Sequence, residues 1–403
     1  MIKLNKIYQA KQQISEFIFK TPFVYSSFLS DFLHSEIFLK CENLQKTGAY
    51  KIRGAYNAIA NLSKEQKAQG VIAASAGNHA QGVAISAKKF GIKAVIIMPE
   101  STPLLKVSAT KNLGAQVILK GDNFDEAYAF ALDYAKEYAL NFIHPFENEN
   151  IMAGQGTLIL EMLDEIGDLD MILVPVGGGG LISGIASAAK QINPNIKIIG
   201  ISAKGAPAMF ESFHNKSIIN SKSVRTIADG IAVRDVNKIN FNIILKCVDD
   251  FIQVDDEEIA NAVLYLLEKH KIVVEGAGAS AVAALLHKKV NLNGSKKIGV
   301  VLSGGNIDAQ MLNIIIEKGL FKSFRKMYIN VTLVDKPGAL MSLSDAIKEA
   351  NANIVKIDYD RFSTKLDYGD AMISITLETK GAQHQELVRK LLFEKGFHFN
   401  EIL

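Results

Sequence analysis

The stretch MILVPVGGGGLISGIASAA, at residues 171–189, decides the fold of this 403-residue chain. It contains no charged residue and is long enough to resemble a membrane-spanning helix. Pro175 and the four glycines Gly177–Gly180 would interrupt such a helix, so the pattern predicts a buried strand, a loop and a helix. A continuous apolar strand followed by a helix is typical of a parallel sheet that helices cover on both faces.

The same alternation of apolar strands and helices extends on both sides of this stretch. Strands are predicted at 70–74, 93–98, 116–119, 141–143, 171–176, 197–201 and 297–302, and helices at 81–90, 104–113 and 125–137. This alternation indicates an α/β fold with right-handed crossovers. We assign this α/β body to residues 1–321.

The pattern changes after a basic segment, KSFRKM at 322–327, which we interpret as a linker. Beyond it, residues alternate between apolar and polar at 327–333, follow helical spacing at 340–347, and alternate again at 355–359 and 373–377. A helix at 386–394 and a short strand at 397–403 complete the order βαββαβ. We therefore expect a second, ferredoxin-like α+β domain at residues 326–403.

Charge and cysteine content exclude several classes of protein. The 45 Lys and Arg residues against 42 Asp and Glu give a net charge of +3, too small to attract nucleic acid or an acidic membrane. Cys41 and Cys247 are too few for a disulfide scaffold and lack metal-ligand spacing. Residues 1–20 show no signal-peptide pattern, so we expect a protein of the reducing cytoplasm.

The glycine run Gly177–Gly180 is the first candidate binding element. Glycines let backbone N–H groups approach an anion closely, and the start of a helix adds positive potential, so phosphate is the expected ligand. A tight strand-to-helix turn without a ligand is the alternative. A dinucleotide-binding G-x-G-x-x-G motif is disfavoured because Leu181 stands where a glycine is needed.

Three further segments carry polar residues near predicted strand ends or helix starts. SAGNH at 75–79 could bind a second anion; there Asn78 is either a ligand or a helix cap, and His79 is better explained as a packed histidine than as a base. SGGN at 303–306 could bind a ligand or form a plain turn, and EGAGA at 275–279 could serve close packing only.

Lys51 lies in GAYKIRG, at residues 48–54, among apolar and aromatic neighbours. Most lone lysines are solvated charges. A partly buried lysine, however, can lose its proton and react as a nucleophile with a carbonyl group. Local sequence alone leaves both interpretations open.

Together these segments resemble the fold-type II pyridoxal-phosphate enzymes, with a tryptophan synthase β-like fold, and among them the threonine dehydratases (threonine ammonia-lyases). The resemblance is carried by KCENLQKTGAYKIRGA at 40–55, SAGNHAQGVA at 75–84, PVGGGGLISG at 175–184, VEGAGA at 274–279 and LSGGN at 302–306. It implies a two-lobed body, with residues of about 45–150 as the smaller, mobile lobe, and pyridoxal 5′-phosphate as cofactor.

On the matching positions, the resemblance implies a role for each residue. Lys51 would hold the cofactor covalently and remove the Cα proton, and Tyr50 would form part of the pocket wall beside it. Asn78 would hydrogen-bond the 3′-oxygen of the cofactor, and Ser303 would face its ring nitrogen, which suits β-elimination. The phosphate would be cradled by Gly177, Gly178, Gly179, Gly180 and Leu181. The substrate carboxylate would be received by Ser75, Ala76, Gly77, Asn78 and His79.

Some positions depart from related enzymes. Ala76 stands where serine racemases carry the hydroxyl that acts on the opposite face of the substrate, which implies a lyase that does not racemise. Ser202, Ala206 and Ala208 align with the divalent-metal ligands of those racemases and supply no carboxylate, so we expect no metal site. Ala49 replaces a serine of many relatives and is expected to affect packing only.

The resemblance implies deamination of L-threonine to 2-oxobutanoate and ammonia, the first step of isoleucine biosynthesis, by a homotetramer. A serine-preferring dehydratase, a β-replacement synthase of the same fold and an amino-acid sensor without activity remain alternatives, although Lys51 argues against the sensor. Residues 326–403 resemble a regulatory ACT domain. Its turn would bind an isoleucine or valine effector through Asp335, Pro337, Gly338, Ala339 and Leu340; a domain used only for oligomerisation is the alternative.

Overall fold

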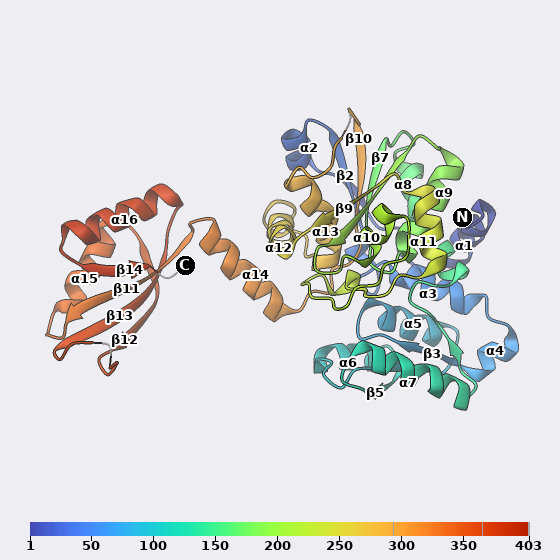
Figure 1. Ribbon diagram of the computed structural model, residues 1–403, viewed down its shortest axis with the longest axis horizontal. Helices are drawn as coiled ribbons and strands as arrows, with labels where there is room; N and C mark the ends of the chain where they lie inside the picture. The colour runs from blue at the N-terminus through green and yellow to red at the C-terminus, as the bar shows by residue number, and fades with distance from the viewer. Residues whose placement is uncertain (293, 365, 402–403) are drawn as a thin grey trace. The chain divides into compact units, whose positions relative to one another are not determined.

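The computed structural model describes residues 1–292, 294–364 and 366–401, and the chain divides into two compact units, one ending at Asp308 and one beginning at Ala309 (Figure 1). The sequence placed this boundary one helix later, at residue 321. The helix in question, α14 (Ala309–Lys322), is grouped with the second unit, where Glu317 pairs with Lys326 at 2.7 Å. Among the described helices, none is both long and apolar enough to span a membrane.

A six-stranded sheet forms the centre of the first unit. In spatial order its strands are β1 (Phe23–Tyr25), β2 (Glu36–Cys41), β10 (Lys297–Leu302), β7 (Met171–Pro175), β8 (Lys197–Ala203) and β9 (Asp250–Val254). All neighbours pair in parallel except β1 and β2. Every residue of β7 is buried, as its uninterrupted apolar sequence predicts.

A second sheet of four parallel strands forms the smaller lobe of the first unit. In spatial order its strands are β5 (Gln116–Leu119), β4 (Ala94–Met98), β3 (Val71–Ala74) and β6 (Asn141–Phe142). Its helices are α3 (Lys51–Ala60), α4 (Lys64–Gln69), α5 (Asn78–Lys89), α6 (Leu104–Asn112) and α7 (Phe124–Glu137). These elements lie together in Figure 1, below the larger sheet, and fall inside the range of about 45–150 expected for this lobe.

The sequence pattern missed most helices of the larger lobe, although it predicted the one that follows the glycine run. The helices of this lobe are α1 (Leu4–Ile14), α2 (Ser27–Leu33), α8 (Glu149–Glu165), α9 (Gly180–Ile192), α10 (Ala208–Asn215), α11 (Lys238–Cys247), α12 (Asp256–Tyr265) and α13 (Gly276–Leu286). Helix α8 shows the reason. It is buried without a break from Ile151 to Met162, so it has no polar face to produce a periodic signal.

The second unit has the predicted βαββαβ order. Its elements after α14 are β11 (Lys326–Val334), α15 (Ala339–Glu349), β12 (Asn353–Asp360), β13 (Asp370–Glu378), α16 (Ala382–Glu394) and β14 (His398–Glu401). The antiparallel sheet has the spatial order β12-β13-β11-β14. Alternate residues of β11 and β13 face a core shared with α15 and α16, so the ferredoxin-like prediction is confirmed. The proposed linker shrinks to residues 323–325.

Candidate active site

The predicted site residues lie on loops that follow the carboxyl ends of parallel strands, where open α/β sheets bind ligands. Two of these loops are joined directly. The backbone N–H of Tyr50 donates to the carbonyl of Ser303 at 3.1 Å, and Ala49 forms a β-bridge with Gly304. The loop after β2, which ends at Lys51, is thereby attached to the loop after β10.

Lys51 is the first residue of α3 and is half-buried. Its Nζ donates to the carbonyl of Pro145 at 3.1 Å and lies 5.4 Å from the centre of the Tyr50 ring. Burial lowers the pKa of the Lys51 amine to about 8, and the nearby Glu275 carboxylate opposes this shift. The interpretation of Lys51 as an ordinary solvated charge is therefore wrong.

Asn78 connects three of the candidate loops. Its amide Nδ2 donates to Oε1 of Glu275 at 2.7 Å, and its Oδ1 accepts from Nδ2 of Asn306, also at 2.7 Å. The N-cap of α5 is Gly77 without a side-chain cap bond, so Asn78 is not the helix cap. These two bonds fix which way the amide faces, and they leave one N–H of Nδ2 to donate to a ligand.

Glu275 is a site residue that the sequence analysis missed, because it read residues 275–279 as a packing segment. Its side chain lies against Asn78, and its backbone N–H donates to the carbonyl of Gly304 at 3.0 Å. Burial raises the pKa of the Glu275 carboxyl to about 7, although the hydrogen bond from Asn78 works in the opposite direction. The one signal in the sequence that could have identified Glu275 is its place directly before the glycines of VEGAGA.

Replacing Glu275 with glutamine is expected to stabilise the cofactor-free protein more at pH 8 than at pH 5. A raised carboxyl pKa means that the wild type loses stability as the pH rises from the ordinary value of 4.5 through about 7. Glutamine avoids this loss, which amounts to roughly 3 kcal/mol at most. Thermal unfolding at both pH values measures it, with the exposed Glu16→Gln as control; an equal effect at both values would contradict the shifted pKa.

The glycine loop has the geometry of an anion cradle. Gly179 adopts a left-handed conformation, with φ of 84°, directly before α9. Nδ2 of Asn240 donates to the carbonyl of Gly178 at 2.6 Å. Because a peptide is planar and trans, the N–H of Gly179 points the opposite way from that carbonyl. The first N–H groups of α9 also lack partners within the helix, as at any helix start.

Packing alone also demands glycine here. A Cβ atom on Gly178 would lie 2.5 Å from the ring of Phe146, and one on Gly177 would lie 2.8 Å from Cα of Ile231. The tight-turn explanation therefore accounts for part of the glycine content. Packing does not explain the direction of the Gly179 N–H, and this direction favours a bound anion.

The loop after β3 brings its predicted residues together at the start of α5. Oγ of Ser75 accepts from the N–H of Gly77 at 3.2 Å, and Ala76 packs against the smaller lobe's core. Nε2 of His79 donates to the carbonyl of Ile143 at 2.8 Å. Burial and the Lys51 charge lower the pKa of His79 to about 3, so it is a neutral, packed residue, as the sequence indicated.

These observations fit pyridoxal phosphate. The site offers a half-buried lysine of lowered pKa, an amide donor on Asn78 and backbone N–H groups at a helix start. Ser303 is buried, with 3% of its surface exposed, and Leu181 is buried beside the glycines. In the described part of the chain no group of three or more His, Cys, Asp or Glu side chains is placed to hold a metal ion.

Comparisons with known proteins agree with this chemistry. The profile of the family described as "Pyridoxal-phosphate dependent enzyme" matches residues 14–304. An L-threonine ammonia-lyase of Thermotoga maritima is 46% identical over 397 residues, which cover 98% of each chain. Maize serine racemase has a similar structure, with a TM-score of 0.75 and 37% identity over 79% of this chain and 98% of that one. The structure of threonine deaminase isoform 2 from Solanum lycopersicum is also similar, with a TM-score of 0.73 and 35% identity. The match covers 78% of this chain and 88% of that one.

Proposed function

This chain belongs to the family of pyridoxal-phosphate-dependent enzymes, and we propose that it deaminates L-threonine to 2-oxobutanoate and ammonia. The observation that carries the proposal is the half-buried Lys51, whose amine has a pKa of about 8 and lies at the start of α3 beside Tyr50. An amino-acid sensor without activity has no need of such a group. The identity with an L-threonine ammonia-lyase over both units supports threonine as substrate.

Pyridoxal phosphate, when bound, withdraws electrons from the bonds at Cα of an amino acid and so makes its proton removable. The chain supplies the groups around it. Burial lowers the pKa of the Lys51 amine and so raises the share of uncharged amine that can accept that proton. Asn78 has an N–H to donate to the ring oxygen, and the glycine loop has N–H groups for the phosphate. Loss of the β-hydroxyl and release of the amine as ammonia complete the conversion, with water lost and regained.

The test is release of 2-oxoacid from threonine and from serine by the purified protein, together with its absorption spectrum. We expect a visible band from lysine-bound cofactor that borohydride abolishes, and faster release of 2-oxobutanoate than of pyruvate. A colourless, inactive protein would support the sensor, and a preference for serine would support the serine dehydratase. Product formed only when a second nucleophile is added would support the β-replacement synthase.

We expect no racemisation and no dependence on divalent metal. Ala76 offers no hydroxyl for the second face of the substrate, and Ser202, Ala206 and Ala208 offer no carboxylate. Chiral analysis of unreacted substrate and activity after dialysis against a chelator, at constant monovalent salt, check the two expectations. Appreciable D-amino acid, or activity restored by magnesium or calcium, would show that these positions have been misinterpreted.

We also propose a cytoplasmic homotetramer in which the second unit is an ACT-like regulatory domain for isoleucine or valine. Two features support the effector turn. Gly338 adopts a left-handed conformation, with φ of 88°, directly before α15, and Asp335 accepts from the Tyr359 hydroxyl at 2.8 Å. Both buried cysteines are unpaired thiols, which is compatible with a reducing compartment.

Gly338→Ala is expected to weaken the response to isoleucine or valine while kcat without effector stays within about twofold. The added Cβ has open space, but alanine disfavours positive φ by about 1 kcal/mol, so the turn shifts. Threonine saturation curves with and without effector measure the response. Gly396→Ala, which has the same strain and the same open space elsewhere in the unit, is the control. An unchanged response in Gly338→Ala would argue against this turn as the effector site.

A further inference from the structure

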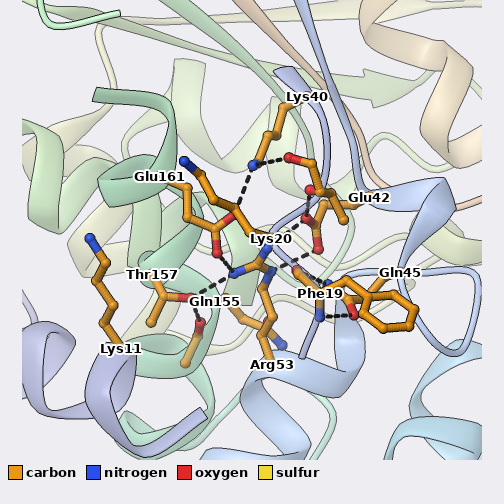
Figure 2. Close-up of polar contacts among 12 residues, drawn as sticks. Lys11, Phe19, Lys20, Lys40, Glu42, Gln45, Arg53, Gln155, Thr157 and Glu161 are labelled. Atoms are coloured by element: carbon orange, nitrogen blue, oxygen red, sulfur yellow. Dashed lines mark hydrogen bonds and ion pairs between the residues drawn. The ribbon is translucent and has the colours of Figure 1, made fainter. Parts of the chain in front are cut away.

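Four charged side chains form a buried cluster, which we call the charge cluster: Lys40, Glu42, Arg53 and Glu161 (Figure 2). The side chains of Lys40, Glu42 and Arg53 have no exposed surface, and that of Glu161 is 9% exposed. Two positive and two negative charges leave no net charge. Such a cluster often stabilises a fold no more than apolar packing of the same volume would, so its presence calls for another explanation.

Arg53 uses every donor that it has. Its Nε and Nη2 both donate to Glu42 at 2.8 Å, and its Nη1 and Nη2 donate to Glu161 at 2.6 and 2.9 Å. Nη1 also donates to Oγ1 of Thr157 at 3.2 Å. Five directed bonds from one planar group fix its position and its orientation. A lysine, with three donors on a single atom, cannot reproduce this fork.

The partners of Arg53 belong to the larger lobe. Glu42 follows β2 of the six-stranded sheet directly, whereas Thr157 and Glu161 lie on α8. Lys40, on β2, joins the same two elements because its Nζ donates to Glu161 at 2.7 Å. Arg53 itself lies in the first turn of α3, two residues after Lys51. The cluster therefore connects the helix that begins with Lys51 to two elements of the larger lobe.

Helix α8 also touches the helix that carries the glycine loop. A Cβ on Gly154 would lie 2.5 Å from the carbonyl oxygen of Arg53, and one on Gly156 would lie 2.8 Å from that of Gly184 in α9. Both crossings are thus in backbone contact. Helix α8 therefore lies between α3 and α9 and contacts both. Helix α3 begins at Lys51, and α9 begins at the glycine loop that would bind the phosphate.

We propose that Arg53 is a positioning residue, which clamps the first turn of α3 to β2 and α8 and so fixes the Lys51 amine relative to the Gly177–Gly180 loop. The proposal rests on the proposed function, since it assumes that the lysine and the loop hold the same cofactor. The backbone crossings set the spacing of the helices, and the Arg53 fork sets how α3 is rotated and how far it slides along α8. Covalent attachment requires this alignment because the phosphate and the reacting carbon of the cofactor are held at once.

The experiment compares Arg53→Lys with Lys40→Met in the full-length protein. The cofactor is removed, pyridoxal phosphate is added back, and the lysine-bound absorption band is followed, with borohydride trapping at Lys51 as a second readout. In Arg53→Lys we expect attachment and kcat to fall by about 100-fold, as for a misplacement of about 1 Å, with the KM for threonine changed less than threefold. Lys40→Met removes a charge of the same cluster outside α3 and should keep attachment within about threefold.

Thermal unfolding of both variants separates positioning from stability. If Arg53→Lys attaches the cofactor as the wild type does, or if both variants lose attachment in proportion to their loss of Tm, the proposal is overturned. Should Arg53→Lys fail to fold, Thr157→Val decides, because it removes one of the five bonds and should slow attachment by about 3- to 10-fold. A wild type that attaches the cofactor but releases no 2-oxobutanoate would refute the proposed function and leave this comparison valid.

Discussion

Lys51→Ala is expected to lower kcat/KM for threonine by at least about 10³-fold. The change removes the group that attaches the cofactor and the base that accepts the Cα proton, and a positioned base alone contributes about 10²- to 10⁴-fold. Steady-state kinetics with threonine measure the loss, and the borohydride-sensitive absorption band should disappear.

We expect Lys51→Ala to retain the cofactor noncovalently through the glycine loop and Asn78, so the loss should lie in kcat rather than in protein folding. Lys64→Ala, at an exposed lysine of α4, is the matched control and should behave as the wild type. Near-normal turnover by Lys51→Ala would contradict the assignment of Lys51 as the reacting lysine. An unfolded variant would be recognised by its circular dichroism and would call for Lys51→Gln instead.

Gly178→Ala is expected to weaken cofactor binding by about 100-fold. Its Cβ would lie 2.5 Å from the Phe146 ring, closer than real contacts allow, so the ring or the glycine loop must move. Asn240 holds the Gly178 carbonyl in place, and a displacement of about 1 Å is enough for such a loss. Titration of the cofactor-free protein with pyridoxal phosphate measures the dissociation constant.

The double variant Gly178→Ala with Phe146→Ala tests the cause. Removing the ring makes room for the new methyl group, so most of the lost affinity should return, whereas Phe146→Ala alone should bind the cofactor within about fivefold of the wild type. The difference between the double variant and the sum of the single ones gives the coupling of the two residues. Additive losses would mean that the clash with Phe146 is not what displaces the loop.

Local sequence was sufficient for the buried strands and for the motifs that carry the candidate site residues, although it missed α8. Buried strands such as β7 are short apolar runs, and Gly179 is a glycine because its φ is positive; both are signals that a few neighbouring residues carry. The segment around Lys51 and the SAGNH segment could also be identified as motifs from the local sequence. What each motif is expected to bind came from the order of the motifs along the chain and from the family resemblance.

The tertiary structure alone decided how these residues are oriented and charged. Glu275 contacts Asn78 across 197 positions of sequence, and Glu161 contacts Arg53 across 108 positions. No periodic pattern in the sequence extends over such separations. Desolvation by such distant segments lowers the pKa of Lys51 to about 8 and raises that of Glu275 to about 7. A sequence determines which groups are present, but burial and the direction of hydrogen bonds depend on what folding brings against them.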